Sequence, residues 1–138
     1  MAIKTIRPHK AADRTAWEEE SGLLNFLSTV NAEVARFDDT FGFGVGILPR
    51  QPQRIDKSAD RLKQLGFVVV RRNSALTGRD YCLYTVLQGK ALYGYIGVYS
   101  GEAIETVREL RHITDFRNAT APLLGWLREL VKASCEKI

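Results

Sequence analysis

The sequence predicts an α+β fold, with a mostly antiparallel sheet of five or six strands and three or four helices. Three observations lead to this class. A chain of 138 residues has the length of one domain and can bury one core. Alternating or β-branched runs typical of strands occur in both halves of the chain, and segments with helical spacing of apolar residues lie between and after them. No internal repeat or linker divides the chain, so we expect residues 1–138 to form a single domain.

The first part of the chain is expected to hold a short strand and a long helical region. Residues 3–7 alternate well enough for the strand. From Asp13 the chain is expected to be helical, with a candidate break at residues 21–22 and a turn at residues 37–40. The apolar stripe of this helical region is Trp17, Leu24, Leu27, Val30 and Val34.

The middle of the chain alternates between strands and a helix. Residues 41–49, FGFGVGILP, indicate a strand that another group approaches closely, because glycine alternates with apolar residues. Residues 55–66 predict a helix with Gly66 in the C-terminal stop position. The β-branched run FVVVRR, residues 67–72, predicts a strand, and residues 73–80 a loop. The apolar positions of the predicted helix are Ile55, Ala59, Leu62 and Leu65.

Residues 81–101, YCLYTVLQGKALYGYIGVYSG, predict two strands joined by a two-residue turn, at Gly89-Lys90 or at Gln88-Gly89. Because side chains alternate between the faces of a sheet, either turn gives the same two sets of side chains. The aliphatic set is expected to pack on helices, whereas the tyrosine set either meets a second layer or stays open. The tyrosine set is Tyr84, Tyr93, Tyr95 and Tyr99, and the aliphatic set is Leu83, Leu87, Leu92, Ile96 and Val98.

The C-terminal part predicts one more strand and a final helix. Residues 106–113, TVRELRHI, are expected to form the strand. The helix is expected from about Thr120 to Lys137, and Pro122 suits its first turn. Its broad apolar face consists of Leu123, Leu124, Trp126, Leu127, Leu130 and Val131.

Composition excludes several classes of protein. Two cysteines make no disulfide framework, and neither they nor His9 and His112 have the spacing of a metal site, so we expect no metal. The chain lacks the apolar run of a signal peptide and any apolar stretch of transmembrane length, so we expect a cytoplasmic protein without membrane contact. The formal net charge of +4 favours anionic partners, such as nucleic acid, a phosphorylated cofactor or an acidic protein.

Three segments resemble the GNAT family of N-acyltransferases. Residues 3–17, IKTIRPHKAADRTAW, are similar to the opening strand and first helix of that family. Residues 109–131, ELRHITDFRNATAPLLGWLRELV, resemble its fourth strand, the arginine that opens the pyrophosphate loop and the helix behind it. Residues 59–72, ADRLKQLGFVVVRR, resemble its distal helix, which ends in Leu-Gly-Phe before a strand. Because this last segment precedes the hairpin, the resemblance implies a permuted or degenerate relative.

The resemblance implies an acyltransferase that moves an acetyl group from acetyl-CoA to an amine of a protein or a small molecule. In that family, backbone N–H groups at a helix N-terminus receive the coenzyme A pyrophosphate, because free amides and the helix dipole favour an anion. By this resemblance Glu109 is the general base for the amine and Tyr95 protonates the departing thiolate. Tyr84, Tyr93 and Tyr99 then form the substrate or partner face. The implied cofactor-binding residues are Arg117, Asn118, Ala119, Thr120 and Ala121.

Two other functions stay open. Residues 93–96, YGYI, resemble the central-strand signature of the RNA-recognition motif, and residues 43–49 resemble its partner strand. In that case bases of a single-stranded nucleic acid stack on Tyr84, Tyr93 and Tyr95. Alternatively, the chain is a non-enzymatic interaction or inhibitor protein that docks through the tyrosine face, because tyrosine offers a large contact area at low entropic cost.

Overall fold

The computed structural model describes residues 22–48, 50–56, 59–71 and 80–135 of the protein. Its elements in chain order are α2 (Leu23–Phe41), β1 (Val45–Ile47), β2 (Arg54–Ile55), α3 (Ala59–Lys63), β3 (Leu65–Arg71), β4 (Asp80–Gln88), β5 (Ala91–Tyr99), β6 (Ala103–Glu109), the 3-10 turn η1 (Phe116–Asn118) and α4 (Thr120–Cys135).

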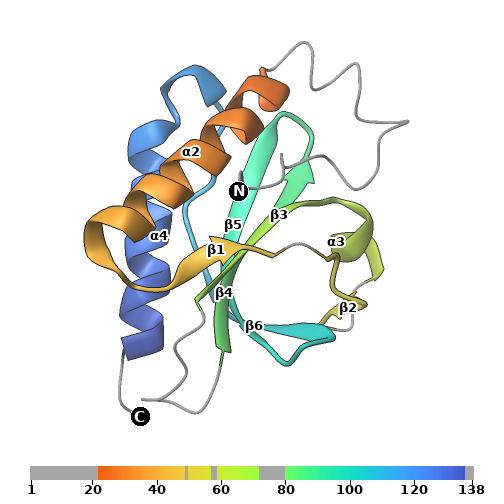
Figure 1. Cartoon of the computed structure of the whole chain (residues 1–138). Coiled ribbons are helices and arrows are strands. Elements are labelled where there is room, and N and C mark those ends of the chain that lie inside the picture. The colour runs from red at the N-terminus through yellow and green to blue at the C-terminus, as the bar shows by residue number, and fades with distance from the viewer. Residues whose placement is uncertain (1–21, 49, 57–58, 72–79, 136–138) are drawn as a thin grey trace.

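The strands form one six-stranded sheet with the order β1-β3-β4-β5-β6-β2. Four neighbouring pairs are antiparallel, and β2 runs parallel to β6. Figure 1 shows that the sheet curls, with α2 and α4 on one side of it and β2 and α3 on the other. The α+β class and the mostly antiparallel sheet are therefore confirmed, with three α-helices in the described residues.

The larger core lies between the sheet and the two long helices. It joins one face of α2 and one face of α4 to the aliphatic face of the hairpin formed by β4 and β5. Each fully buried aliphatic side chain of this kind contributes about 1.5–3 kcal/mol relative to an exposed one. The prediction that the aliphatic set packs on helices is confirmed. Members with no exposed surface include Val30, Val34, Leu83, Leu92, Ile96, Leu123, Leu127 and Leu130.

The hairpin has the predicted turn and the predicted faces. Gln88 is paired with Ala91, which leaves Gly89-Lys90 as the two-residue turn, and Gly89 adopts a left-handed φ of 60°. Tyr84 lies directly opposite Tyr95, and their rings stack with centroids 5.1 Å apart. The period of two along each strand then places every tyrosine of the predicted set on one face.

A second, smaller core covers the tyrosine face. Because the sheet curls, Ile55 of β2 and Leu62 of α3 pack over this face together with Ile104 of β6. Tyr84 is completely buried and Tyr95 is 6% exposed. Of the two arrangements that the sequence allowed for the tyrosine face, the structure therefore has the second layer.

The end of α2 differs from the prediction of a turn at residues 37–40. The helix continues to Phe41, because Phe37 is part of the larger core and Gly42 provides the left-handed residue that ends a helix. The Asp38 carboxylate then accepts hydrogen bonds from the backbone N–H groups of Gly44 and Val45. As a result β1 is only three residues long, shorter than the strand predicted for residues 41–49.

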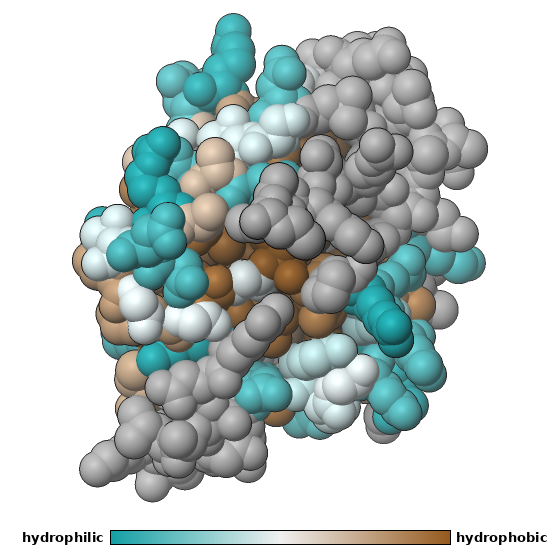
Figure 2. Space-filling model, viewed as in Figure 1, coloured by the Kyte–Doolittle hydropathy of each residue, from teal (hydrophilic) through white to brown (hydrophobic). Residues whose placement is uncertain are grey.

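Phe41 leaves an aromatic side chain on the surface at this corner. It is 50% exposed, and its ring stacks on Phe43 with centroids 5.6 Å apart. Figure 2 shows hydrophobic surface near β1 in the middle of this view, with polar side chains around it.

The helix predicted for residues 55–66 is wrong at both ends. Ile55 lies in β2, the described helix is limited to Ala59–Lys63, and Gly66 belongs to β3. A Cβ atom at position 66 would lie 2.5 Å from the Thr85 hydroxyl, whose oxygen accepts the N–H of Phe67. The glycine is therefore required by a close approach of β4, and it does not end a helix.

The C-terminal predictions are confirmed in outline. The strand predicted for residues 106–113 runs over Ala103–Glu109, and after it Leu110 and Ile113 still hydrogen-bond to β5. α4 begins at Thr120 and buries the predicted apolar face. The predictions for residues 3–7, 13–21 and 72–79 lie outside the described residues. No helix in the described parts of the chain is both long enough and apolar enough to cross a membrane.

Burial of the Cys82 thiol predicts a loss of stability at alkaline pH. Burial raises the pKa of this thiol from its ordinary 9.0 to about 12. Between these values the unfolded chain releases the proton and the folded chain keeps it, so the free energy of unfolding falls by about 1.4 kcal/mol per pH unit. Burial also raises the pKa of Tyr84, which acts in the same direction. Urea unfolding at a series of pH values should show this slope, and Cys82→Ala should reduce it; equal slopes for the two proteins would contradict the assignment.

Candidate functional site

A polar network lies inside the tyrosine face and joins β2, β4, β6 and α3. The Asp56 carboxylate accepts hydrogen bonds from the backbone N–H of Thr106 at 2.7 Å and from its hydroxyl at 2.5 Å. The Tyr84 hydroxyl is hydrogen-bonded to the Thr106 hydroxyl, and the Arg61 guanidinium donates to both of these oxygens. Asp56 adopts a left-handed φ of 50°, which aspartate tolerates better than most residues. Because its polar groups bond to one another, the network fixes β2 and α3 over the sheet.

The two tyrosines of this network keep their protons. The Arg61 guanidinium lies 4.5 Å from the centre of the Tyr95 ring, as expected for a cation–π contact. Burial raises the pKa of both Tyr84 and Tyr95, and the negative charge of Glu109 adds to the shift of Tyr95. Both phenols therefore stay protonated over the physiological pH range.

A bulge in β6 decides which way the charged side chains after it point. Ile96 pairs with Arg108, whereas the next residue of β5, Gly97, pairs with Thr106, so Val107 is the extra residue. The bulge brings Arg108 to the α4 side, where it forms an ion pair with Glu129 at 2.8 Å. It also brings Glu109 to the tyrosine face, opposite Tyr95.

A trough of about 660 Å³ lies between the end of β6 and the first half of α4. Its apolar residues are Leu110, Pro122, Gly125 and Trp126, and its charged or polar residues are Arg108, Glu109, Arg111, His112 and Glu129. The Trp126 indole N–H donates to the Arg111 carbonyl oxygen at 2.8 Å, which holds the chain after β6 against α4. The trough thus has an apolar floor between charged walls.

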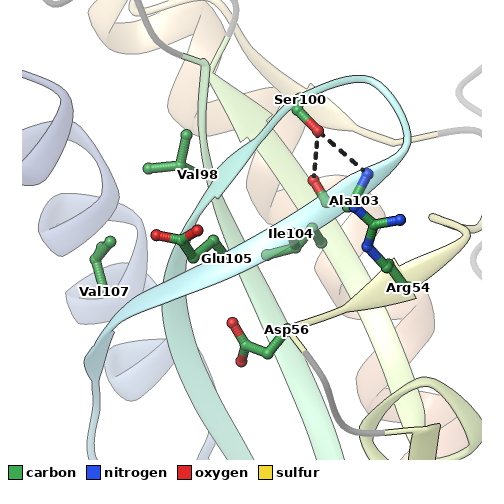
Figure 3. Close-up of a pocket in the computed structure, with 8 residues that line it drawn as sticks. All are labelled: Arg54, Asp56, Val98, Ser100, Ala103, Ile104, Glu105 and Val107. Carbon is green, nitrogen blue, oxygen red and sulfur yellow. Dashed lines mark hydrogen bonds between the residues drawn. The ribbon is translucent and has the colours of Figure 1, made fainter.

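A second hollow of about 810 Å³ surrounds the other half of β6. Figure 3 shows that Val98, Glu105 and Val107 lie on the α4 side of this strand, whereas Arg54 and Asp56 lie on the opposite side. The hollow is therefore not one enclosed pocket: part of its lining is on the α4 face of β6 and part is on the opposite face. On the α4 side it adds Val107, which is 50% exposed, to the apolar surface beside the trough.

Two of the five residues predicted to bind the cofactor already use their backbone N–H groups in hydrogen bonds to Asp115. The backbone N–H of Arg117 donates to the Asp115 carboxylate at 3.1 Å, and that of Asn118 donates to the Asp115 carbonyl oxygen. The bond from the Arg117 backbone, followed by that from its side chain, lowers the pKa of Asp115. A pyrophosphate bound by the Arg117 N–H would have to displace this carboxylate, which caps η1. Of the other three residues, Ala119 is buried, whereas Thr120 and Ala121 are exposed.

The predicted catalytic and substrate residues are brought together only in part. Glu109 and Tyr95 are cross-strand neighbours, and Tyr84 is stacked behind Tyr95. Tyr93 is half-buried and stacks on His112 with centroids 5.0 Å apart, whereas the Tyr99 hydroxyl bonds to the Gly101 carbonyl oxygen at the far end of the sheet. Bases could stack on Tyr84 or Tyr95 only if the second layer opened.

Sequence reasoning missed the residues that give this region its chemistry. Asp56, Arg61 and Thr106 carry no local signal, because Thr106 lies 50 residues after Asp56 and 45 residues after Arg61. Gly125 was a usable signal, since a glycine inside an apolar helix often marks open space or a close contact. A Cβ atom at this position would meet nothing within 4 Å.

No family model, no curated protein and no solved structure matches this chain. In the described ranges, no three His, Cys, Asp or Glu side chains are grouped so that they could hold a metal ion.

Proposed function

We propose that the protein is a non-enzymatic interaction module that binds a segment of a partner protein in the trough between β6 and α4. The observation that carries this proposal is the apolar floor around Trp126, which opens between the walls that bear Arg108 and Arg111. Arginine is among the residue types most enriched at the energetic centres of protein interfaces, and Arg111 is exposed here, whereas the buried Trp126 supports the floor from below. The proposal takes up the interaction function that the sequence left open as an alternative, and it moves the docking surface because Ile55 and Leu62 cover the tyrosine face.

Peptide display tests this function. Random dodecapeptides would be selected on the wild-type protein, and the affinities of the enriched peptides would be measured by fluorescence anisotropy. Gly125→Phe adds a ring over the open floor of the trough, so we expect it to weaken binding at least about tenfold, which corresponds to 1.4 kcal/mol. Arg128→Phe adds the same ring at an exposed position of α4 and should leave binding unchanged.

Circular dichroism and thermal unfolding would establish that both variants are folded. Failure to enrich any peptide would contradict the proposal, and so would enriched peptides that bind Gly125→Phe as tightly as they bind the wild type.

Acyl transfer from acetyl-CoA to an amine is the second candidate, and the pairing of Tyr95 with Glu109 favours it. Burial raises the pKa of Tyr95, so its phenol stays protonated and is available as a general acid, and the exposed Glu109 carboxylate opposite it is the candidate base. The Asp115 carboxylate opposes this candidate, because it already occupies the Arg117 N–H predicted for the cofactor. Calorimetric titration with acetyl-CoA distinguishes the two functions. An acyltransferase must bind acetyl-CoA and should release or absorb heat at millimolar ligand, whereas the interaction module need not bind it.

A further inference from the structure

We infer that the partner segment carries an aspartate or glutamate next to an apolar residue, with the carboxylate bound by Arg111 and the apolar side chain placed over Trp126 and Gly125. This inference rests on the proposed function and specifies its ligand.

The first argument is the position of Arg111. Its carbonyl oxygen accepts the Trp126 indole N–H, so its backbone is fixed at the rim of the trough. Its side chain is exposed, and within the described ranges it forms no ion pair. The exposed guanidinium on this fixed backbone can bind a carboxylate through two parallel hydrogen bonds.

The second argument is the charge balance of the walls. Arg108 and Glu129 compensate each other at 2.8 Å. Glu109 faces the tyrosine side opposite Tyr95, and its charge affects that phenol. Arg111 is therefore the charge of the trough that a ligand can complement, and the complementary group is an anion.

The third argument is the shape of the floor beside this cation. The indole of Trp126 is almost completely buried, whereas Pro122 is exposed and Gly125 leaves open space above the helix backbone. An apolar side chain placed there would remove both its own surface and that of the floor from water. A nucleic acid fits less well, because Arg111 is the one charge of the described walls left to complement, whereas a chain of phosphates is bound by several cations.

The same selection tests the inference through the composition of the peptides. We expect the enriched peptides to share an acidic residue within a few positions of a leucine, isoleucine or aromatic residue. Arg111→Gln should weaken their binding about tenfold, because a hydrogen-bonded charge is lost. Arg128→Gln removes an exposed arginine of α4 outside the trough and is the matched control, with unchanged affinity expected. Binding should also weaken as the salt concentration rises.

The possible outcomes separate the two proposals. Peptides that lack an acidic residue, or that bind Arg111→Gln as well as the wild type, would overturn the inference, while their loss of binding to Gly125→Phe would leave the proposed function standing. Two results would show that the trough binds something else and would overturn the inference. One is single-stranded RNA that displaces the enriched peptides, and the other is a dimer of this chain that Gly125→Phe dissociates. Absence of any enriched peptide would overturn both.

Discussion

Gly94→Val is expected to lower the free energy of unfolding by about 3 kcal/mol, the upper end of the usual range for overpacking. A Cβ atom at position 94 would lie 2.7 Å from the Trp126 indole, closer than a Cβ atom approaches a non-bonded carbon. The indole cannot retreat easily, because it is buried and its N–H is bonded to the Arg111 carbonyl oxygen. Urea unfolding followed by circular dichroism would measure the loss.

Gly125→Ala is the matched control for this substitution, because it adds the same first carbon beside the same tryptophan. Nothing lies within 4 Å of the added atom, and alanine favours a helix interior over glycine by about 1 kcal/mol, so stability should rise. In a Trp126→Leu background, Gly94→Val should cost less than in the wild type, since the two residues are in contact. Equal costs in both backgrounds would show that the indole is not the obstacle.

The hairpin and α4 could be predicted from the sequence because their side-chain periods are regular. A two-residue turn fixes the pairing of β4 with β5, so the tyrosine and aliphatic faces follow from counting. Gly94 lies on the aliphatic face, where its missing side chain leaves room for Trp126. In α4 the helical period alone identifies the buried face.

The second layer could not be predicted, because its elements are too short to show a period. β2 has two residues and α3 has five, and both are held by contacts with distant strands. Asp56 bonds to Thr106 fifty positions later, a pairing that no local pattern indicates. The β6 bulge added a further obstacle, since simple alternation from Thr106 would place Arg108 on the tyrosine face instead of beside α4.

The candidate site was predicted in part. The sequence placed Tyr95 and Glu109 in one region, and the structure makes them cross-strand neighbours. For the cofactor loop, the sequence contained a usable warning: Asp115 stands two residues before Arg117, and aspartate commonly accepts backbone N–H groups at such a position. The trough itself depends on how the chain after β6 lies against α4, which no sequence pattern indicates.

Arg71→Met is expected to lower the free energy of unfolding by about 3 kcal/mol, because hydrogen bonds to a buried charged group are lost and their acceptors are left unpaired. The Arg71 side chain joins three elements. Its Nε–H donates to the Phe43 carbonyl oxygen at 3.1 Å, and one terminal nitrogen donates to the Ser134 hydroxyl at 2.6 Å. The guanidinium also lies over the Phe43 ring, 5.2 Å from its centre.

The location of Arg71 explains how this cation is tolerated in a buried place. Within the described residues it has no carboxylate partner, but it lies at the C-terminal end of α4, where the helix dipole and the Val131 carbonyl oxygen favour a positive charge. Arg71→Lys should recover only part of the loss, because a single ammonium group cannot bond to Phe43 and Ser134 with the geometry of a guanidinium.

Arg117→Met is the matched control, since it removes an arginine whose side chain is 87% exposed and pairs with Asp115 at the surface. Its expected cost is below about 1 kcal/mol and should vanish as salt screens the pair. The cost of Arg71→Met should persist in about 0.5 M salt, because a buried group is screened much less. Urea unfolding of both variants at low and high salt measures the difference. A small, salt-sensitive cost for Arg71→Met would mean that the guanidinium is solvated and does not hold β1, β3 and α4 together.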